Sequence, residues 1–242
     1  MSSPARAQER VALSRERVLH AAVELADARG LPALTMRRLA QELGVEAMSL
    51  YYYVSGKDDL LGGMVDLVTS QIVIPPDSSG WKAALRLEAL SEYDVLTRHP
   101  WAASLTLSNR TVSEPRLQRM NWILGTLRQA GFSAEQTDLA YHALESHIMG
   151  FTLWEVGMNL GAADDLARLA TGFLERVSVK DVPWLVEHVH QHLKPRNPDD
   201  EGAFAFGLDL ILDGLERMPG GGSDQVRTQV TSSPESSSRD AS

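Results

Sequence analysis

The sequence predicts an all-α protein divided into a small N-terminal part and a larger C-terminal part. Its apolar residues recur mostly at the three- and four-residue spacing of helices, and only the short run QIVIP at 71–75 has the pattern of a strand. Serine or threonine precedes several of these segments and glycine follows them, as is usual at helix ends. The run PPDSSG at 75–80 is the clearest linker, so it is the predicted boundary between the two parts.

The N-terminal part, residues 14–70, is expected to follow a flexible stretch over 1–13 and to begin with a helix. Ser14 can cap this first helix, and Gly30 ends it. One face of the helix is expected to be buried. That face carries Val18, Ala21, Ala22, Leu25 and Ala28.

Two short helices joined by a tight turn follow. Thr35 can cap the first of them, Gly44 ends it, and the next helix covers about 46–54. A further helix over about 58–70 leads toward the C-terminal part. The order predicts a three-helix helix-turn-helix unit, in which the last short helix buries one face and presents the other.

The C-terminal part, residues 81–218, is expected to consist of longer helices. Their expected ranges are 81–98, 100–108, 114–130, 133–159, 164–177, 183–193 and 199–218. Ser133 and Gln136 have the spacing of a capping box at the start of the 133–159 helix. The tail over 219–242 is rich in Gly, Ser and Thr, which predicts disorder.

Composition and charge restrict the classes of function. The 242 residues include no cysteine, which excludes disulfides and thiol catalysis, and 43% are hydrophobic, enough for a packed core. The net charge is −9, but residues 1–57 carry +2 and residues 58–242 carry −11, so contact with a polyanion is expected only near the N-terminus. Without a signal-like start or a long apolar run, we expect a cytoplasmic protein with no membrane partner.

The helix over 46–54 has two different faces. With about 100° between successive residues, Ala47, Leu50 and Val54 fall close together and form the predicted inner face. No acidic residue lies within 47–54. Hydroxyl and apolar side chains can contact base edges and thymine methyl groups in the major groove of DNA. The outward face carries Met48, Ser49, Tyr51, Tyr52 and Tyr53.

Three more residues are placed to hold the phosphate backbone of double-stranded DNA. Thr35 lies at a helix N-terminus, where free N–H groups can bind phosphate, and Arg37 lies in the first turn of the same helix. Lys57 lies at the start of the next helix, where a phosphate partner would offset the unfavourable position of a cation.

Residues 14–68 resemble the DNA-binding domain of the TetR family of transcriptional regulators. The matching segments are ARGL at 28–31, LTMR at 34–37, LAQELGV at 39–45, SLY at 49–51, Val54, Lys57 and LL at 60–61. The resemblance implies that the recognition helix reads half of a palindromic operator and that the following lysine holds phosphate. It assigns base reading to Met48, Ser49 and Tyr51, phosphate contacts to Thr35, Arg37, Tyr53 and Lys57, and either role to Tyr52.

Residues 81–218 resemble the regulatory half of the family more loosely. RHPW at 98–101 and AGFS at 130–133 are similar to the tetracycline-repressor branch. The resemblance implies a homodimer, held by a four-helix bundle of the 133–159 and 199–218 helices, and a small-molecule inducer. The tetracycline sites of that branch hold a magnesium chelate through histidines and a glutamate. Glu155 lies near the corresponding point, but the histidines have no clear counterpart, so we expect no metal or other cofactor.

An inducer pocket would be apolar and aromatic, with a few placed polar groups. The expected lining residues are His99, Trp101, Asn109, Trp122, His142, His147, Met149 and Trp154. From these observations we expect a ligand-responsive repressor that a small hydrophobic or aromatic molecule releases from DNA.

Other interpretations stay open at this point. The protein could be an activator, or a DNA-binding regulator without a ligand. It could also be an all-α enzyme in which Glu145, His147 and Glu155 form an acid–base cluster, although no catalytic motif supports this and we expect no enzyme. His188 and His192 are four residues apart and could share a metal ion, but no third ligand is evident.

Overall fold

The structure is a computed structural model that describes residues 12–76, 80–108, 113–158, 168, 171–172, 176, 180–192 and 202–218. The described residues form helices and their connections, without a strand, and the run at 71–75 is irregular. The first helices are α1 (Arg15–Arg29), the 3₁₀ helix η1 (Leu31–Ala33), α2 (Met36–Leu43), α3 (Ala47–Leu50) and α4 (Lys57–Thr69). The others are α5 (Trp81–Arg98), α6 (Pro100–Ser108), α7 (Glu114–Gln129), α8 (Ala134–Met158), α10 (Pro183–His192) and α11 (Gly202–Glu216).

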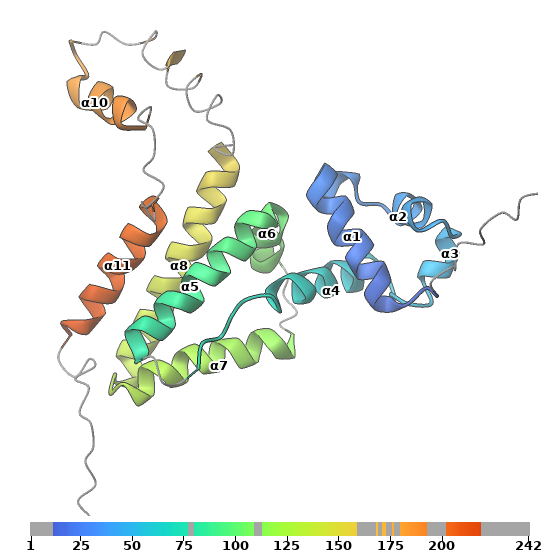
Figure 1. Ribbon diagram of the computed structural model, residues 1–242, viewed down its shortest axis with the longest axis horizontal. Helices are drawn as coiled ribbons and strands as arrows, with labels where there is room; N and C mark the ends of the chain where they lie inside the picture. The colour runs from blue at the N-terminus through green and yellow to red at the C-terminus, as the bar shows by residue number, and fades with distance from the viewer. Residues whose placement is uncertain are drawn as a thin grey trace, which may run out of the picture.

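The helices gather in two groups, which we call the head (residues 14–70) and the body (residues 81–218). Helices α1 to α4 form the head at one end of the molecule, and α4 runs toward the body (Figure 1). Helices α5, α6, α7, α8 and α11 pack together in the body, with α6 next to the head (Figure 1). A single apolar core extends through both groups, from Val18 in α1 to Leu215 in α11.

The start of α1 confirms the predicted cap, because the Ser14 hydroxyl accepts a hydrogen bond from the backbone N–H of Arg17 at 3.2 Å. The predicted inner face is partly wrong. Ala28 is exposed and Ala21 is partly exposed, whereas Val23 and Ala26 are buried. Helix α1 packs against both α2 and α4, so its buried stripe is broader than that of a helix covered on one side.

The helix-turn-helix is present, but its third helix is shorter than expected. Thr35 caps α2 as predicted, and Gly44 ends it in the left-handed conformation at φ 67°. The predicted helix over 46–54 is regular only as α3. The N–H groups of residues 49, 51 and 53 bond carbonyls three residues back, so the chain tightens into turns around the α-helical segment.

The body follows the predicted order within the described residues. Ser133 and Gln136 form the predicted capping box, with bonds of 2.8 and 3.1 Å between backbone N–H and side-chain oxygen. Helices α8 and α11 pack so closely that a Cβ atom on Gly207 would lie 2.5 Å from the His147 ring. The expected helix over 164–177 and the two chain ends lie largely outside the described residues. Among the described helices, none has both the length and the apolar composition that crossing a bilayer requires.

Candidate nucleic-acid interface

The side chains of the predicted recognition face lie on α3 and the turn after it, and all of them except the half-buried Tyr53 are exposed. Leu50 and Val54 are buried, whereas Met48 and Tyr52 are 76% and 87% exposed. Ser49 and Tyr51 are also exposed, and Ala47 and Tyr53 are half-buried. The side chains that could reach base edges therefore lie on the solvent side of a segment that is anchored from behind.

The other residues predicted to bind phosphate lie at the starts of α2 and α4. The Thr35 hydroxyl accepts a hydrogen bond from the N–H of Arg38 at 3.2 Å, and both Thr35 and Arg37 are exposed. Lys57 is exposed at the first position of α4. A capping hydroxyl, an arginine and a lysine at two helix starts can bind phosphates.

A network that the sequence did not predict holds the recognition segment in place. Arg15 at the start of α1 donates to the Tyr53 carbonyl at 2.9 Å and forms an ion pair with Asp59 of α4 at 2.6 Å. Asp59 also accepts from the Ser55 N–H at 2.7 Å. The hydrogen bond from Arg15, followed by that from Ser55, lowers the pKa of Asp59 from 3.8 to about 2. The contact therefore contributes fully to the stability of the fold above about pH 3.8, and this contribution is lost as the pH falls through about 2.

The head contacts the body through a second carboxylate, Asp27 near the end of α1. Its Oδ1 accepts from the indole N–H of Trp101 at 2.6 Å, and its Oδ2 accepts from Nδ1 of His99 at 2.9 Å. Because a carboxylate can only accept, Nδ1 of His99 carries the proton, and the opposite nitrogen, Nε2, is buried without a hydrogen-bond partner. We call this contact the Asp27 latch. His99 and Trp101 were expected to line a ligand pocket, but the structure places both in this latch.

The body contains a buried charge cluster centred on Arg119 of α7. Its guanidinium donates to Glu88 and Glu92 of α5 and, at 2.9 Å, to Glu145 of α8. Burial raises the pKa of Glu92 to about 8 and also raises that of Glu88, although Arg119 acts in the opposite direction. The cluster joins three helices of the body through charge-assisted hydrogen bonds.

The remaining expected pocket residues do not meet at one cavity. Trp122 lines a cavity of about 170 Å³ between α5 and α7, together with Trp81. His147 stacks on Phe204 and bonds its carbonyl at 2.9 Å. His142 faces solvent, Met149 is buried and Trp154 is half exposed. Asn109 lies outside the described residues.

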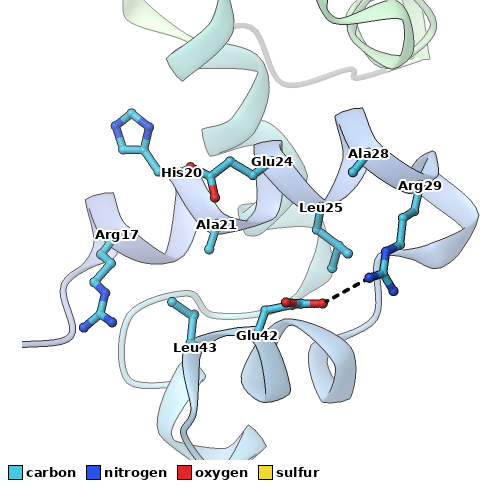
Figure 2. A pocket seen from close by; sticks show the side chains of 9 residues that line it. All are labelled: Arg17, His20, Ala21, Glu24, Leu25, Ala28, Arg29, Glu42 and Leu43. Atoms are coloured by element: carbon cyan, nitrogen blue, oxygen red, sulfur yellow. Dashed lines mark ion pairs between the residues drawn. The ribbon is translucent and has the colours of Figure 1, made fainter. Parts of the chain in front are cut away.

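Two further cavities were not expected. One, of about 200 Å³, lies between the end of α4 and the start of α7 and is lined by Ile72, Ile74 and Arg116, among others. The other, of about 420 Å³, lies in the head between α1 and α2 (Figure 2). Arg29 and Glu42 form an ion pair of 3.9 Å across it, and Arg17 and Glu24 also line it. This balance of charges gives phosphate no excess of positive charge to bind.

The acid–base cluster considered for an enzyme is not assembled. Glu145 bonds Arg119, His147 bonds the Phe204 carbonyl, and Glu155 accepts from the Tyr93 hydroxyl at 2.5 Å. The three side chains, all on α8, thus have separate partners on α7, α11 and α5. Within the described part of the chain, no three His, Asp or Glu side chains are placed to share a metal ion.

Comparison with known proteins identifies two matching families. Residues 18–64 match the family described as bacterial regulatory proteins, tetR family, and residues 74–218 match the tetracyclin repressor-like C-terminal domain. The HTH-type transcriptional repressor DrrR1 of Streptomyces coeruleorubidus is 33% identical over 213 residues, covering 84% of this chain and 77% of that protein. Tetracycline repressor protein class D of Escherichia coli is 30% identical over 209 residues, covering 84% and 89%.

Solved structures show the same architecture. ActR of Streptomyces coelicolor, crystallised in complex with actinorhodin, superposes with a TM-score of 0.68 at 26% identity. The match covers 84% of this chain and 97% of ActR. The similarity thus extends over both the head and most of the body.

Proposed function

Because the chain belongs to the TetR family of bacterial transcriptional regulators, we propose that it is a repressor released from DNA by a small molecule. It binds a palindromic operator as a homodimer. The observation that carries this proposal is the exposed face of α3, which has no acidic residue over 47–54, together with the exposed Arg37 and Lys57 at the starts of α2 and α4. The family consists of regulators rather than enzymes.

In this proposal the two sets of side chains have different tasks. Met48, Ser49 and Tyr51 contact base edges in the major groove, and Tyr52 contacts either a base or a phosphate. Thr35, Arg37, Tyr53 and Lys57 bind phosphates and fix the register of the head. Selection of bound fragments from the source genome would identify the operator. A purified protein that retains no duplex at low ionic strength would contradict the proposal.

Lys57→Ala is expected to weaken binding to all duplexes to a similar extent. The lysine would bind phosphate rather than bases. The negative slope of log K against log salt should therefore become less steep by about 0.9 for each lysine removed. Fluorescence anisotropy over a series of salt concentrations measures both effects. Lys180→Ala is the matched control, because Lys180 is an exposed lysine of the body. A change in base preference with an unchanged salt slope would assign Lys57 to the bases instead.

The dimer is proposed to form through α8 and α11. These helices contact each other, and large apolar side chains remain exposed on both: Trp154 and Val156 on α8, and Phe206 and Leu210 on α11. A second copy would cover these side chains with its own two helices and produce a four-helix bundle. Two heads would then read the two halves of the operator.

Leu210→Asp is expected to convert the dimer to monomers and to remove most operator affinity. Leu210 is 59% exposed, so the change should leave the monomer folded, but burying an unpaired carboxylate should weaken association at least about a hundredfold. Sedimentation velocity measures the mass. Leu87→Asp, at a 52% exposed leucine of α5, is the control and should remain dimeric. An unchanged dimer in Leu210→Asp would place the interface elsewhere.

The inducer is proposed to be an apolar or aromatic molecule bound in the body. Cavities of about 170 and 200 Å³ adjoin α7, and the second is also lined by Thr69 and Ser70 at the end of α4. Since α4 is part of the head, a molecule bound there would act directly on the position of the head. The ligand must favour the state that does not fit the operator.

Thermal-shift screening with a small-molecule library tests this part of the proposal. A compound that binds the folded protein raises its unfolding midpoint, and an inducer must also release the operator in the anisotropy assay. Compounds that raise the midpoint without releasing DNA would contradict the inducer role. Activation of the neighbouring genes by the DNA-bound protein would favour an activator.

A further inference from the structure

We propose that Asp27 is a positioning residue for operator recognition, which sets the spacing of half-sites that the dimer accepts. This inference rests on the proposed DNA-binding function, and it assigns a determinant of specificity to a residue with no predicted DNA contact. Three features of the structure support it: the geometry of the Asp27 latch, its place on a rigid helix, and the identity of its partners.

The two hydrogen bonds of the Asp27 latch depend on the angles between the carboxylate and its donors. Asp27 is exposed, whereas both donors, Trp101 and His99, are buried, at 7% and 9% exposed. Apolar contacts between two helices tolerate small rotations, but a carboxylate that must meet two fixed donors permits little change of angle. The latch therefore fixes the orientation of α1 relative to α6.

Helix α1 transmits this orientation to the DNA-binding face. Asp27 and Arg15 lie at opposite ends of α1, twelve residues or about 18 Å apart. Arg15 holds the Tyr53 carbonyl and Asp59, so the start of α1 and the recognition segment move together. A rotation of α1 at the latch thus displaces the recognition face of the same head.

The partners of Asp27 lie at the junction between α5 and α6. His99 is the last residue before α6, and it joins α6 to α5, which carries Glu88 and Glu92 of the buried cluster. Any rearrangement of α5 or α6 moves both donors, and the carboxylate must follow or lose them. The latch therefore couples the shape of the body to the distance between the two heads of a dimer.

The first experiment measures spacing preference. One additional base pair between half-sites shifts them by about 3.4 Å and about 35°. For the wild type, affinity should be highest at one spacing. In Asp27→Ala, the ratio of the affinity at the best spacing to the affinity at neighbouring spacings should fall about tenfold, or about 1.4 kcal/mol. Base preference should be unchanged. Trp101→Phe, which removes one donor but keeps a ring, should act in the same direction.

Glu24→Ala is the matched control, because Glu24 is an exposed acid on the same helix. Its spacing ratio should equal that of the wild type. An unchanged ratio in Asp27→Ala, or an equal loss of affinity at every spacing, would overturn the inference, since uniform weakening is the effect of a merely unstable head. Failure of the wild type to bind any duplex would instead contradict the proposed function.

A second experiment needs no DNA. The chain has no cysteine, so Tyr52→Cys supplies one spin-label site per protomer, and the distance between labels in the dimer reports the separation of the heads. Adding Asp27→Ala should broaden this distribution, and adding Glu24→Ala should leave it unchanged. Equal distributions in all three proteins would show that the latch does not position the head.

Discussion

Replacing Arg119 by methionine is expected to destabilise the protein by about 3–5 kcal/mol, the usual result of leaving buried carboxylates without their cation. Arg119 compensates two buried glutamates of α5, Glu88 and Glu92, and a third on α8, Glu145. Methionine fills a similar volume, so the loss reflects charge rather than a cavity. Chemical unfolding followed by circular dichroism measures the change.

The loss should depend on pH. A buried carboxyl with a raised pKa gains a proton on folding, so the free energy of unfolding falls as the pH rises from its unfolded value to its folded one. For Glu92 in the wild type this range extends from 4.5 to about 8. Without Arg119 the carboxyls are harder to ionise, so the variant should lose more stability at about pH 8 than at about pH 5.5.

Two controls separate buried charge from packing in this experiment. Adding Glu88→Gln and Glu92→Gln to Arg119→Met should recover part of the loss, because the uncompensated charges are gone. Arg98→Met removes a half-exposed arginine paired with Asp94 and should cost no more than about 1 kcal/mol. A loss in Arg119→Met that is equal at both pH values and is not rescued would mean that packing dominates.

Leu50→Ala should have the second large effect, a loss of about 2–5 kcal/mol in the stability of the head. Leu50 is fully buried and anchors α3, so truncation opens a cavity directly behind the recognition face. Operator binding should fall as well, for every sequence alike, because the outward side chains lose their support. Urea unfolding and anisotropy measure the two effects.

Met48→Ala is the paired experiment at a neighbouring position. Met48 is 76% exposed, so its truncation should change the free energy of unfolding by no more than about 0.5 kcal/mol. It should alter base preference instead, at the position where the thioether meets a base edge. Similar unfolding losses in the two variants would contradict the orientation of α3 described above.

Local signals in the sequence predicted much of this architecture. The caps at Ser14 and Thr35 and the capping box at Ser133 each depend on residues within three positions, so they can be recognised without knowledge of the fold. The outward position of Met48 and Tyr52 follows from helical periodicity alone. Periodicity overestimated the length of α3, because it does not distinguish α-helical bonds from the tighter turns at its ends.

The contacts that could not be predicted join residues far apart in the chain. Asp27 meets residues 72 and 74 positions away, and Arg119 meets Glu88 and Glu92 at separations of 31 and 27. The sequence shows that such residues are charged, but not which helix they face. For the same reason His99 and Trp101 were predicted to line a pocket, although the carboxylate that binds them belongs to α1.

The Asp27 latch has a consequence for building hybrid regulators. The Arg15–Asp59 network lies wholly within the head, so a head transplanted onto another body would keep its reading segment intact. Asp27 is different, since its two donors are supplied by the recipient. A chimera that lacks a matching histidine and tryptophan would still recognise each half-site, but the distance between its two heads would no longer match the spacing of the half-sites. Residues 27, 99 and 101 should therefore be exchanged together.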